Sequence, residues 1–333
     1  MPVRRLGSID VIRALTMYFM VFVNDLWTDR QIPAWLEHAP AKADAMGFAD
    51  IIFPAFLFIV GLSIPYSQQR RLDRGQSSVL IFRHILLRSI ALIVMGFFQM
   101  NMENYSNQSL LPQPVWVILV TLSFFLVWLD YPKAKRKMAL WLQVAGVIML
   151  IVMAALYKGN SPHGIIWMAP HWWGILGLIG WAYFACASIS LFAKEKWWII
   201  VLFFLFFVGF NSSVMLDHPD FTSSFRHWIG SMGLGNASNS SITILGVICA
   251  VLYRKFSGKL LKVEIILILM ALVLFAFGFA TRPLWGISKI RATPSWTTIC
   301  AATSTLISAF LLYLIDKKGK ENARTEQNKK KKK

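Results

Sequence analysis

The sequence predicts an all-α, polytopic membrane protein with about ten transmembrane helices, and three observations lead to this fold class. First, 56% of the 333 residues are hydrophobic, only 15% are charged, and the mean hydropathy is +0.56. This balance is too apolar for a soluble domain of this length. Second, apolar runs of about 17 to 25 residues recur, and a helix of that length crosses a hydrocarbon core of ~30 Å. Third, the basic residues gather in alternate loops.

The ten apolar segments are predicted to be the transmembrane helices. They lie at residues 9–26, 48–66, 80–100, 115–130, 138–156, 172–192, 197–211, 241–253, 264–280 and 296–315. No linker separates them, so we expect one transmembrane domain over residues 1–316. Residues 317–333 are polar and strongly basic, which is typical of a disordered tail.

The net charge of +18 would suggest nucleic acid as the partner of a soluble protein, so the position of the charges matters. Most of the 34 Lys and Arg residues lie in alternate loops, such as "RRLDR" at 70–74 and "KAKRK" at 133–137, and in the basic tail. By the positive-inside rule, these loops and both termini are cytoplasmic. The basic excess therefore reflects topology, with the lipid bilayer as partner and no nucleic acid. We expect a multi-pass protein of the cytoplasmic (inner) membrane.

The first apolar segment and the cysteines exclude other classes. Asp10 and Arg13 interrupt that segment and no small-residue cleavage site follows it, so we expect it to be retained and not cleaved as a signal peptide. Cys186, Cys249 and Cys300 occur singly in predicted helices. This spacing indicates neither a disulfide framework nor a zinc cluster, and no metal is predicted.

Ionisable groups at membrane depth are costly, so those in the first helix are functional candidates. Asp10 and Arg13 are spaced i, i+3, which also fits a simple intrahelical ion pair. Asn24 and Asp25 stand near the other end of the helix. Arg13 and Asn24 are about 16 Å apart along a helix, so they could hold opposite ends of one long ligand.

The segment "EHAPAKADAMGFADIIFPAFLFIVG" joins a polar outer loop to the second apolar helix. His38 lies in the loop and Asp50 in the first turn of the helix. A loop that folds back between Asn24 and Asp50 would bring an amide, an imidazole and a carboxylate together. Such a set suits a general base or an acyl carrier with an oxyanion donor. Spacing alone leaves open the alternative of a solvated histidine.

The last outer loop, "TRPLWGISKIRATPSW" at 281–296, concentrates positive and aromatic side chains on the side where basic residues are scarce. These are Arg282, Trp285, Lys289, Arg291 and Trp296. The cluster suggests an anionic ligand, anchoring to lipid headgroups, or ion pairs with the outer aspartates Asp25, Asp44 and Asp50.

Gly174, Gly177 and Gly180 recur every three residues and predict a smooth stripe on one helix. Close helix packing explains such a stripe, and a narrow slot for an extended ligand is the alternative. His171 precedes the stripe beside a pair of tryptophans, where aromatic rings could stack on a sugar.

Four segments together resemble one known family. They are "GSIDVIRALTMYFMVFVND", "HAPAKADAMGFADIIFPAFLFIVGLSI", "WGILGLIGWAYF" and "ISKIRATPSW". The first two are the more specific, and all four are similar to the heparan-alpha-glucosaminide N-acetyltransferase family of transmembrane acyltransferases, particularly its bacterial members. The family pattern of an arginine, an asparagine, a loop histidine and an aspartate is met by Arg13, Asn24, His38 and Asp50.

The resemblance implies that cytoplasmic acetyl-CoA is the donor and that the amine of glucosamine or a glucosaminide at the outer face is the acceptor. His38 falls on the catalytic histidine, with Asp50 and Asn24 as its catalytic partners. Donor binding is expected at Arg13, Arg83, Arg88, Gly174 and Gly177. Acceptor binding is expected at Trp285, Lys289, Arg291 and His171.

A second function stays open at this point. Some relatives are described as sugar-uptake components, so an inner-membrane amino-sugar transporter is the alternative to an acetyltransferase. A transporter would favour broken helices at mid-membrane and an internal repeat, and neither is evident in the sequence. A homodimer is left open as well.

Overall fold

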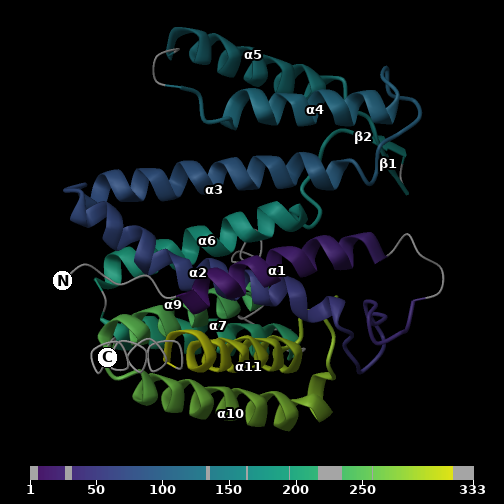
Figure 1. Cartoon of the computed structure of the whole chain (residues 1–333). Coiled ribbons are helices and arrows are strands. Elements are labelled where there is room, and N and C mark those ends of the chain that lie inside the picture. The colour runs from purple at the N-terminus through teal and green to yellow at the C-terminus, as the bar shows by residue number, and fades with distance from the viewer. Residues whose placement is uncertain are drawn as a thin grey trace, which may run out of the picture. The chain divides into compact units, whose positions relative to one another are not determined.

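The computed structural model describes residues 7–26, 32–132, 136–162, 164–194, 196–216, 235–256 and 258–317. Within them the chain is almost entirely helical (Figure 1). The α-helices are α1 (Gly7–Leu26), α2 (Ala49–Asp73), α3 (Ser78–Asn101), α4 (Gln113–Trp128), α5 (Arg136–Ala155), α6 (Gly174–Ala193), α7 (Trp197–Met215), α9 (Ser238–Lys255), α10 (Leu260–Trp285) and α11 (Pro294–Leu311). A short π-helix, η3 (Leu312–Lys317), continues α11.

Each of the ten predicted apolar segments corresponds to one of these helices, which confirms the all-helical class for the described residues. Seven described helices are long and apolar enough to cross a membrane: α2, α3, α5, α6, α7, α10 and α11 with η3. Helix α4 is apolar but shorter. The count of ten crossings and the cytoplasmic position of both termini stay predictions. The expected basic tail, apart from Lys317, lies outside the described residues.

The chain divides into two compact units. The first unit comprises Met1–Ile85 and Ala182–Lys333, and the second comprises Leu86–Trp181, so that α3 and α6 each contribute to both. The predicted transmembrane domain, residues 1–316, includes the second unit and all of the first except residues 317–333, and its definition as one domain stays a prediction.

Helix α9 is the innermost element of the first unit. Fourteen of its eighteen residues are buried, including the serines of its first turn. A helix buried all round needs partners for its polar groups, and α11 supplies them. Ser238 and Thr297 share a hydrogen bond of 2.6 Å between their hydroxyls, and Tyr253 and Ser308 share one of 2.7 Å. These bonds join α9 to α11 at both ends.

Helices α2 and α9 touch through their backbones where two glycines meet. A Cβ placed on Gly246 would collide with the carbonyl oxygen of Phe58, and a Cβ on Gly61 would collide with that of Thr243. Small residues at a crossing allow helices in a membrane to approach this closely, because van der Waals packing is a main source of their association. The crossing fixes α2, whose first turn carries Asp50.

Helix η3, near the C-terminus, contacts the first residues of α1 in the first unit. The carboxylate of Asp316 in η3 accepts hydrogen bonds of 3.1 Å from the backbone N–H groups of both Gly7 and Ser8. These are among the groups that a helix N-terminus leaves without an intrahelical partner, and a negative charge there is favourable. Asp316 therefore caps α1 from the far end of the sequence.

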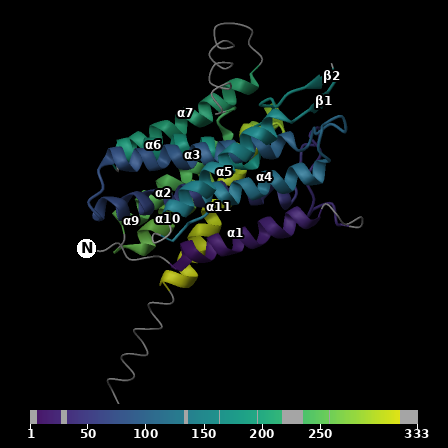
Figure 2. The ribbon, with the colours of Figure 1, turned by 90° about the horizontal axis from the view of Figure 1, so that it is seen from above.

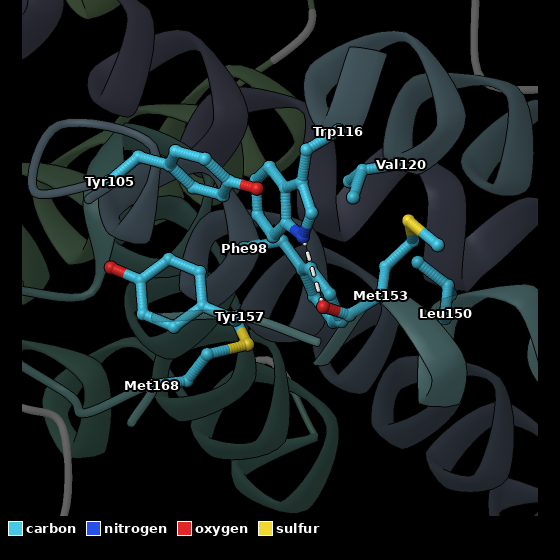
Figure 3. Packing of buried hydrophobic residues seen from close by; sticks show 8 residues of the cluster. All are labelled: Phe98, Tyr105, Trp116, Val120, Leu150, Met153, Tyr157 and Met168. Carbon is cyan, nitrogen blue, oxygen red and sulfur yellow. Dashed lines mark hydrogen bonds between the residues drawn. The ribbon is translucent and has the colours of Figure 1, made fainter. Parts of the chain in front are cut away.

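The second unit is organised around an aromatic cluster. Trp116 of α4 is fully buried, and its Nε1 donates a 2.9 Å hydrogen bond to the carbonyl of Met153 in α5 (Figure 3). Tyr105 and Tyr157 pack on the Trp116 ring with centroids 5.3 and 5.6 Å away. Figure 3 shows the other members of the cluster, which are Phe98, Val120, Leu150 and Met168.

The stretch between α5 and α6, expected to be a loop, contains a two-stranded antiparallel hairpin. Strand β1 (Gly159–Ser161) pairs with β2 (Gly164–Ile166) in the register Gly159↔Ile166. Figures 1 and 2 show it near the start of α4. Gly164, the first residue of β2, has φ of +117°, a conformation open to glycine.

Candidate functional site: a histidine–aspartate pair at the end of α2

His38 and Asp50 are in direct contact in the first unit. Nδ1 of His38 lies 2.7 Å from Oδ1 of Asp50. The Asp50 side chain is completely buried, whereas half of the His38 side chain is exposed. The pair therefore has a fixed, buried acid at one end and an imidazole open to a reactant at the other.

The loop before α2 is shaped around the second oxygen of Asp50. Oδ2 accepts hydrogen bonds of 3.0 Å from the backbone N–H groups of Ala39 and Gly47. Gly47 has no room for a side chain, because a Cβ there would overlap the carbonyl oxygen of Glu37. One carboxylate thus closes the loop and holds His38 at the same time.

The hydrogen bonds determine which nitrogen of His38 is free. An ionised carboxylate can only accept, so the proton of the neutral ring is on Nδ1 and points at Asp50. The tautomer is inferred from this network. Nε2 then has the lone pair, and it is this nitrogen that can take a proton or attack an electrophile.

The carbonyl of Asp50 has an unusual environment for a helix residue. Pro54, four residues on, has no N–H to donate back to it. The thiol of Cys300 in α11 lies 3.9 Å from this oxygen and faces it from the neighbouring helix. Cys300 therefore contacts the backbone of Asp50. The sequence gave no reason to expect this contact, because Cys300 stands alone in its predicted helix.

Lys289, from the loop between α10 and α11, completes the site. Its Nζ lies 3.2 Å from Nδ1 and 3.3 Å from Nε2 of His38, and 4.0 Å from Oδ1 of Asp50. Burial lowers the pKa of the Lys289 ammonium, and the nearby charge of Asp50 opposes that shift. The result is a partly desolvated amine next to the lone-pair nitrogen of the histidine.

Asp44 joins two loops: the lysine loop, residues 286–293, which carries Lys289, and the histidine loop, residues 32–48, which carries His38. Its Oδ1 accepts a 2.6 Å hydrogen bond from the N–H of Ile287, and its Oδ2 accepts one of 2.9 Å from Nε of Arg282. These bonds keep the pKa of Asp44 below its ordinary value, the backbone bond from Ile287 having the larger effect. Ser288 adds a bond of 3.2 Å from its hydroxyl to the carbonyl of Ala41.

Removing the Asp44 carboxylate is expected to make the lysine loop more mobile. In Asp44→Ala, the N–H of Ile287 loses its acceptor, so we expect its hydrogen exchange to accelerate by about tenfold. Asp44→Asn keeps a carbonyl oxygen for Ile287 and serves as the matched control, with a smaller increase. Hydrogen exchange read by mass spectrometry over residues 286–293 measures both. Equal exchange in the wild type and Asp44→Ala would show that Asp44 does not hold the loop.

The remaining candidates of the first unit lie around this pair in different ways. Trp285 accepts through its carbonyl a 3.0 Å hydrogen bond from Nη2 of Arg291, within the lysine loop. Asn24, near the end of α1, is exposed, and it makes no hydrogen bond to His38 or Asp50. The structure thus joins His38, Asp50 and Lys289, and leaves the amide of Asn24 outside the contacts of that set.

The basic candidates for donor binding are exposed. Nη2 of Arg13 donates a 3.0 Å hydrogen bond to the hydroxyl of Ser63, and its Nη1 lies 3.6 Å from Asp10, the intrahelical ion pair that the i, i+3 spacing allows. Arg83, in the first half of α3, is exposed.

In the second unit, the glycine stripe of α6 packs against α3. A Cβ on Gly96 of α3 would overlap the backbone N of Gly177, and one on Gly174 would lie 2.7 Å from the carbonyl oxygen of Gly96. The stripe is thus in close helix contact, the first of its two interpretations. Arg88 and His171, also in this unit, are exposed, and the backbone N–H of His171 points at the sulfur of Met100, 3.4 Å away.

No group of three or more His, Cys, Asp or Glu able to hold a metal ion occurs in the described part of the chain.

Together, the apolar helices and the imidazole held by a buried carboxylate at a helix end define a helical membrane protein with a candidate acid–base site. The chain belongs to the family described as "Domain of unknown function (DUF5009)", whose model matches residues 5–216. This range includes His38 and Asp50 but not Lys289.

Two curated relatives give the site a chemical context. The "Heparan-alpha-glucosaminide N-acetyltransferase" of Homo sapiens is 35% identical over 105 residues, which are 30% of this chain and 14% of the human protein. The protein of the same name from Mus musculus is 34% identical over 105 residues, with the same coverage. The chain thus matches 14% of the length of these relatives. The relationship expected from the sequence motifs is confirmed as a distant one.

Proposed function

We propose that this protein transfers the acetyl group of acetyl-CoA from the cytoplasmic side to the amine of an amino sugar, glucosamine or a glucosaminide, at the opposite face. The observation that supports this best is the contact between His38 and Asp50, which leaves the lone pair on Nε2 of a half-exposed imidazole, with Lys289 beside it. The distant relationship to N-acetyltransferases supports the reaction class.

In the proposed reaction, Nε2 of His38 takes a proton from the sugar ammonium, and the amine attacks the thioester carbonyl carbon. The C–S bond then breaks, the imidazolium returns its proton to the sulfur of CoA, and the second proton that the nitrogen loses on becoming an amide passes to solvent. A variant of this route has Nε2 accept the acetyl group first and pass it to the amine. In both routes Asp50 keeps Nδ1 protonated and stabilises positive charge on the ring.

Other residues would bind the two substrates and the developing charge. Asn24 is proposed as a donor to the oxyanion. Arg13, Arg83 and Arg88 would attract the phosphates of CoA, since guanidinium groups bind phosphate in a bidentate manner. Gly174 and Gly177 pack against Gly96 of α3, so they are not proposed for donor binding. The acceptor would meet Trp285, Lys289, Arg291 and His171.

The function is tested with purified protein, radiolabelled acetyl-CoA and glucosamine. We expect labelled N-acetylglucosamine and free CoA, and no labelled product from glucose, which has no amine. Absence of labelled product from glucosamine would refute the proposal. Uptake of glucosamine into liposomes without any acetyl donor would instead support the transporter, for which the continuous described helices give no specific indication.

Asp50→Asn is expected to lower acetyl transfer by about 10²- to 10⁴-fold. An asparagine must turn its carbonyl oxygen toward the N–H groups of Ala39 and Gly47, so its NH₂ group faces Nδ1 of His38. Nδ1 must then accept, and the proton moves to Nε2, where the lone pair is needed. The assay above measures the loss. Because the side chain keeps its size and its loop bonds, unchanged unfolding behaviour with lost activity is the expected combination, and full activity would exclude the tautomer role.

A further inference from the structure

We propose that Lys289 is a self-acetylation site: when no acceptor is bound, the acetyl group brought to His38 is transferred to Nζ of Lys289. This inference rests on the proposed acetyl transfer at His38. In the proposed function Lys289 only binds the acceptor. Here it becomes an acetyl acceptor itself, and the product is N-ε-acetyllysine.

The distance between the two nitrogens supports the transfer. Nζ of Lys289 lies 3.3 Å from Nε2 of His38, the nitrogen at which the acetyl group arrives. A carbonyl carbon bonded to Nε2, or held beside it, is therefore within reach of Nζ without movement of either loop. Two groups held at such separations react with effective molarities of about 10⁵ M or more.

The position of Lys289 is fixed by the loop that carries it. Asp44 binds the N–H of Ile287, and Ser288 binds the carbonyl of Ala41, so the two residues before Lys289 are both tied to the histidine loop. Only 26% of the Lys289 side chain is exposed. The amine is thus held beside His38, with less conformational freedom than the amine of an ordinary exposed lysine.

The protonation of Lys289 also fits a nucleophile. Only the neutral amine attacks a carbonyl, and burial lowers the pKa of Lys289, which enlarges the neutral fraction at a given pH. The titratable groups that face it are Asp50, which opposes this shift, His38 and Cys300. The charge of Asp50 limits the effect, so we expect the reaction to be slower than transfer to a bound acceptor.

The chemistry balances without a further reactant. The lone pair of Nζ forms a bond to the acetyl carbon, and the bond from that carbon to the sulfur of CoA, or to Nε2 of an acetylated His38, breaks. One proton of the amine ends on the thiol of CoA, with His38 as the intermediate base. The products are acetyllysine and CoA, and no oxidation or reduction takes place.

The modification would change the site. An acetylated Lys289 has no positive charge, so the buried carboxylate of Asp50 loses the cation that lies 4.0 Å away. The amide also adds volume next to His38. Incubation with acetyl-CoA in the absence of sugar is therefore expected to inactivate the enzyme progressively.

The test uses the full chain, ¹³C-labelled acetyl-CoA and no sugar, followed by chymotryptic digestion and mass spectrometry. Lys42 is the internal control, because it is exposed and lies in the same loop as His38. We expect the labelled fraction at Lys289 to exceed that at Lys42 by about tenfold or more, to fall when glucosamine is added, and to be absent in His38→Ala. Equal labelling of both lysines, labelling that persists in His38→Ala, or an unmodified Lys289 would overturn the proposal.

Sugar acetylation, measured in the same preparation, separates the two proposals. If glucosamine is acetylated and Lys289 is not, self-acetylation is refuted and the proposed function stands. If neither is acetylated, both are refuted. Lys289→Arg keeps the positive charge but cannot form this amide, so its activity should not decline during incubation with the donor. A decline equal to that of the wild type would also count against Lys289 as the modified group.

Discussion

Replacing His38 by alanine is expected to lower the rate of acetyl transfer to glucosamine by about 10³-fold, within the 10² to 10⁴ range typical of a lost general acid–base group. The substitution removes Nε2, the nitrogen that takes the proton or the acetyl group, and leaves Asp50 with its bonds to Ala39 and Gly47. The loop is thus expected to keep its fold. Product formation with labelled acetyl-CoA measures the effect.

The half-exposed position of His38 allows a sharper test than the rate alone. Free imidazole can enter the space left by the missing ring, so we expect it to restore part of the activity of His38→Ala. His84→Ala is the control for loss of an imidazole elsewhere, because His84 contacts Arg71 through a 2.8 Å bond and has no proposed role in the reaction. It should stay within about twofold of the wild type. Equal rates for His38→Ala and the wild type would remove His38 from the mechanism.

Gly246→Ala is expected to destabilise the protein by about 3 kcal/mol or more, the upper range for an overpacked core. The added methyl group would overlap the carbonyl oxygen of Phe58, which belongs to the backbone of α2 and cannot rotate away. Relief requires α2 and α9 to separate, which would also displace Asp50. Thermal unfolding in detergent, read as a shift of Tm, measures the loss.

Gly209→Ala is the matched control, because Gly209 also lies within a helix, α7, and a Cβ there meets no atom within 4 Å. Alanine is the better helix former by about 1 kcal/mol, so Tm should be unchanged or rise. Equal Tm values for Gly246→Ala and Gly209→Ala would contradict the close contact of α2 with α9.

The helices could be predicted because the length and apolarity of each segment are local properties. Some helix ends could not be predicted, because contacts with other parts of the fold extend those helices. The prediction for α7 ended at residue 211, whereas the helix continues to Met215. Asn211 is buried there, and its side-chain N–H donates a 3.0 Å bond to the carbonyl of Ala292. The beginning of α9 was missed for the same reason, since its serines are polar in sequence and buried in the structure. The β1–β2 hairpin is too short for a periodic signal.

The site was predictable only in part. His38 and Asp50 are twelve residues apart, so a local argument could propose their contact, although spacing alone did not decide it. Lys289 is 251 residues from His38, and only the predicted topology placed both on one side of the membrane. The choice of ion-pair partners among Asp25, Asp44 and Asp50 required the structure, which pairs Arg282 with Asp44. The role proposed for Asn24 stays a prediction.

The burial of α9 has a consequence for how the chain is made. Its first turn contains serine and asparagine side chains, and Thr297 of α11, the partner of Ser238, is synthesised 59 residues later. A helix with such a polar end partitions poorly into lipid alone. We therefore expect α9 to insert cooperatively with its partners. It would pack first against α2, which is already synthesised, and insert fully only after α11 has left the ribosome. Truncation before α11 should leave a chain that is inserted incompletely and degraded, although most of its apolar helices are present.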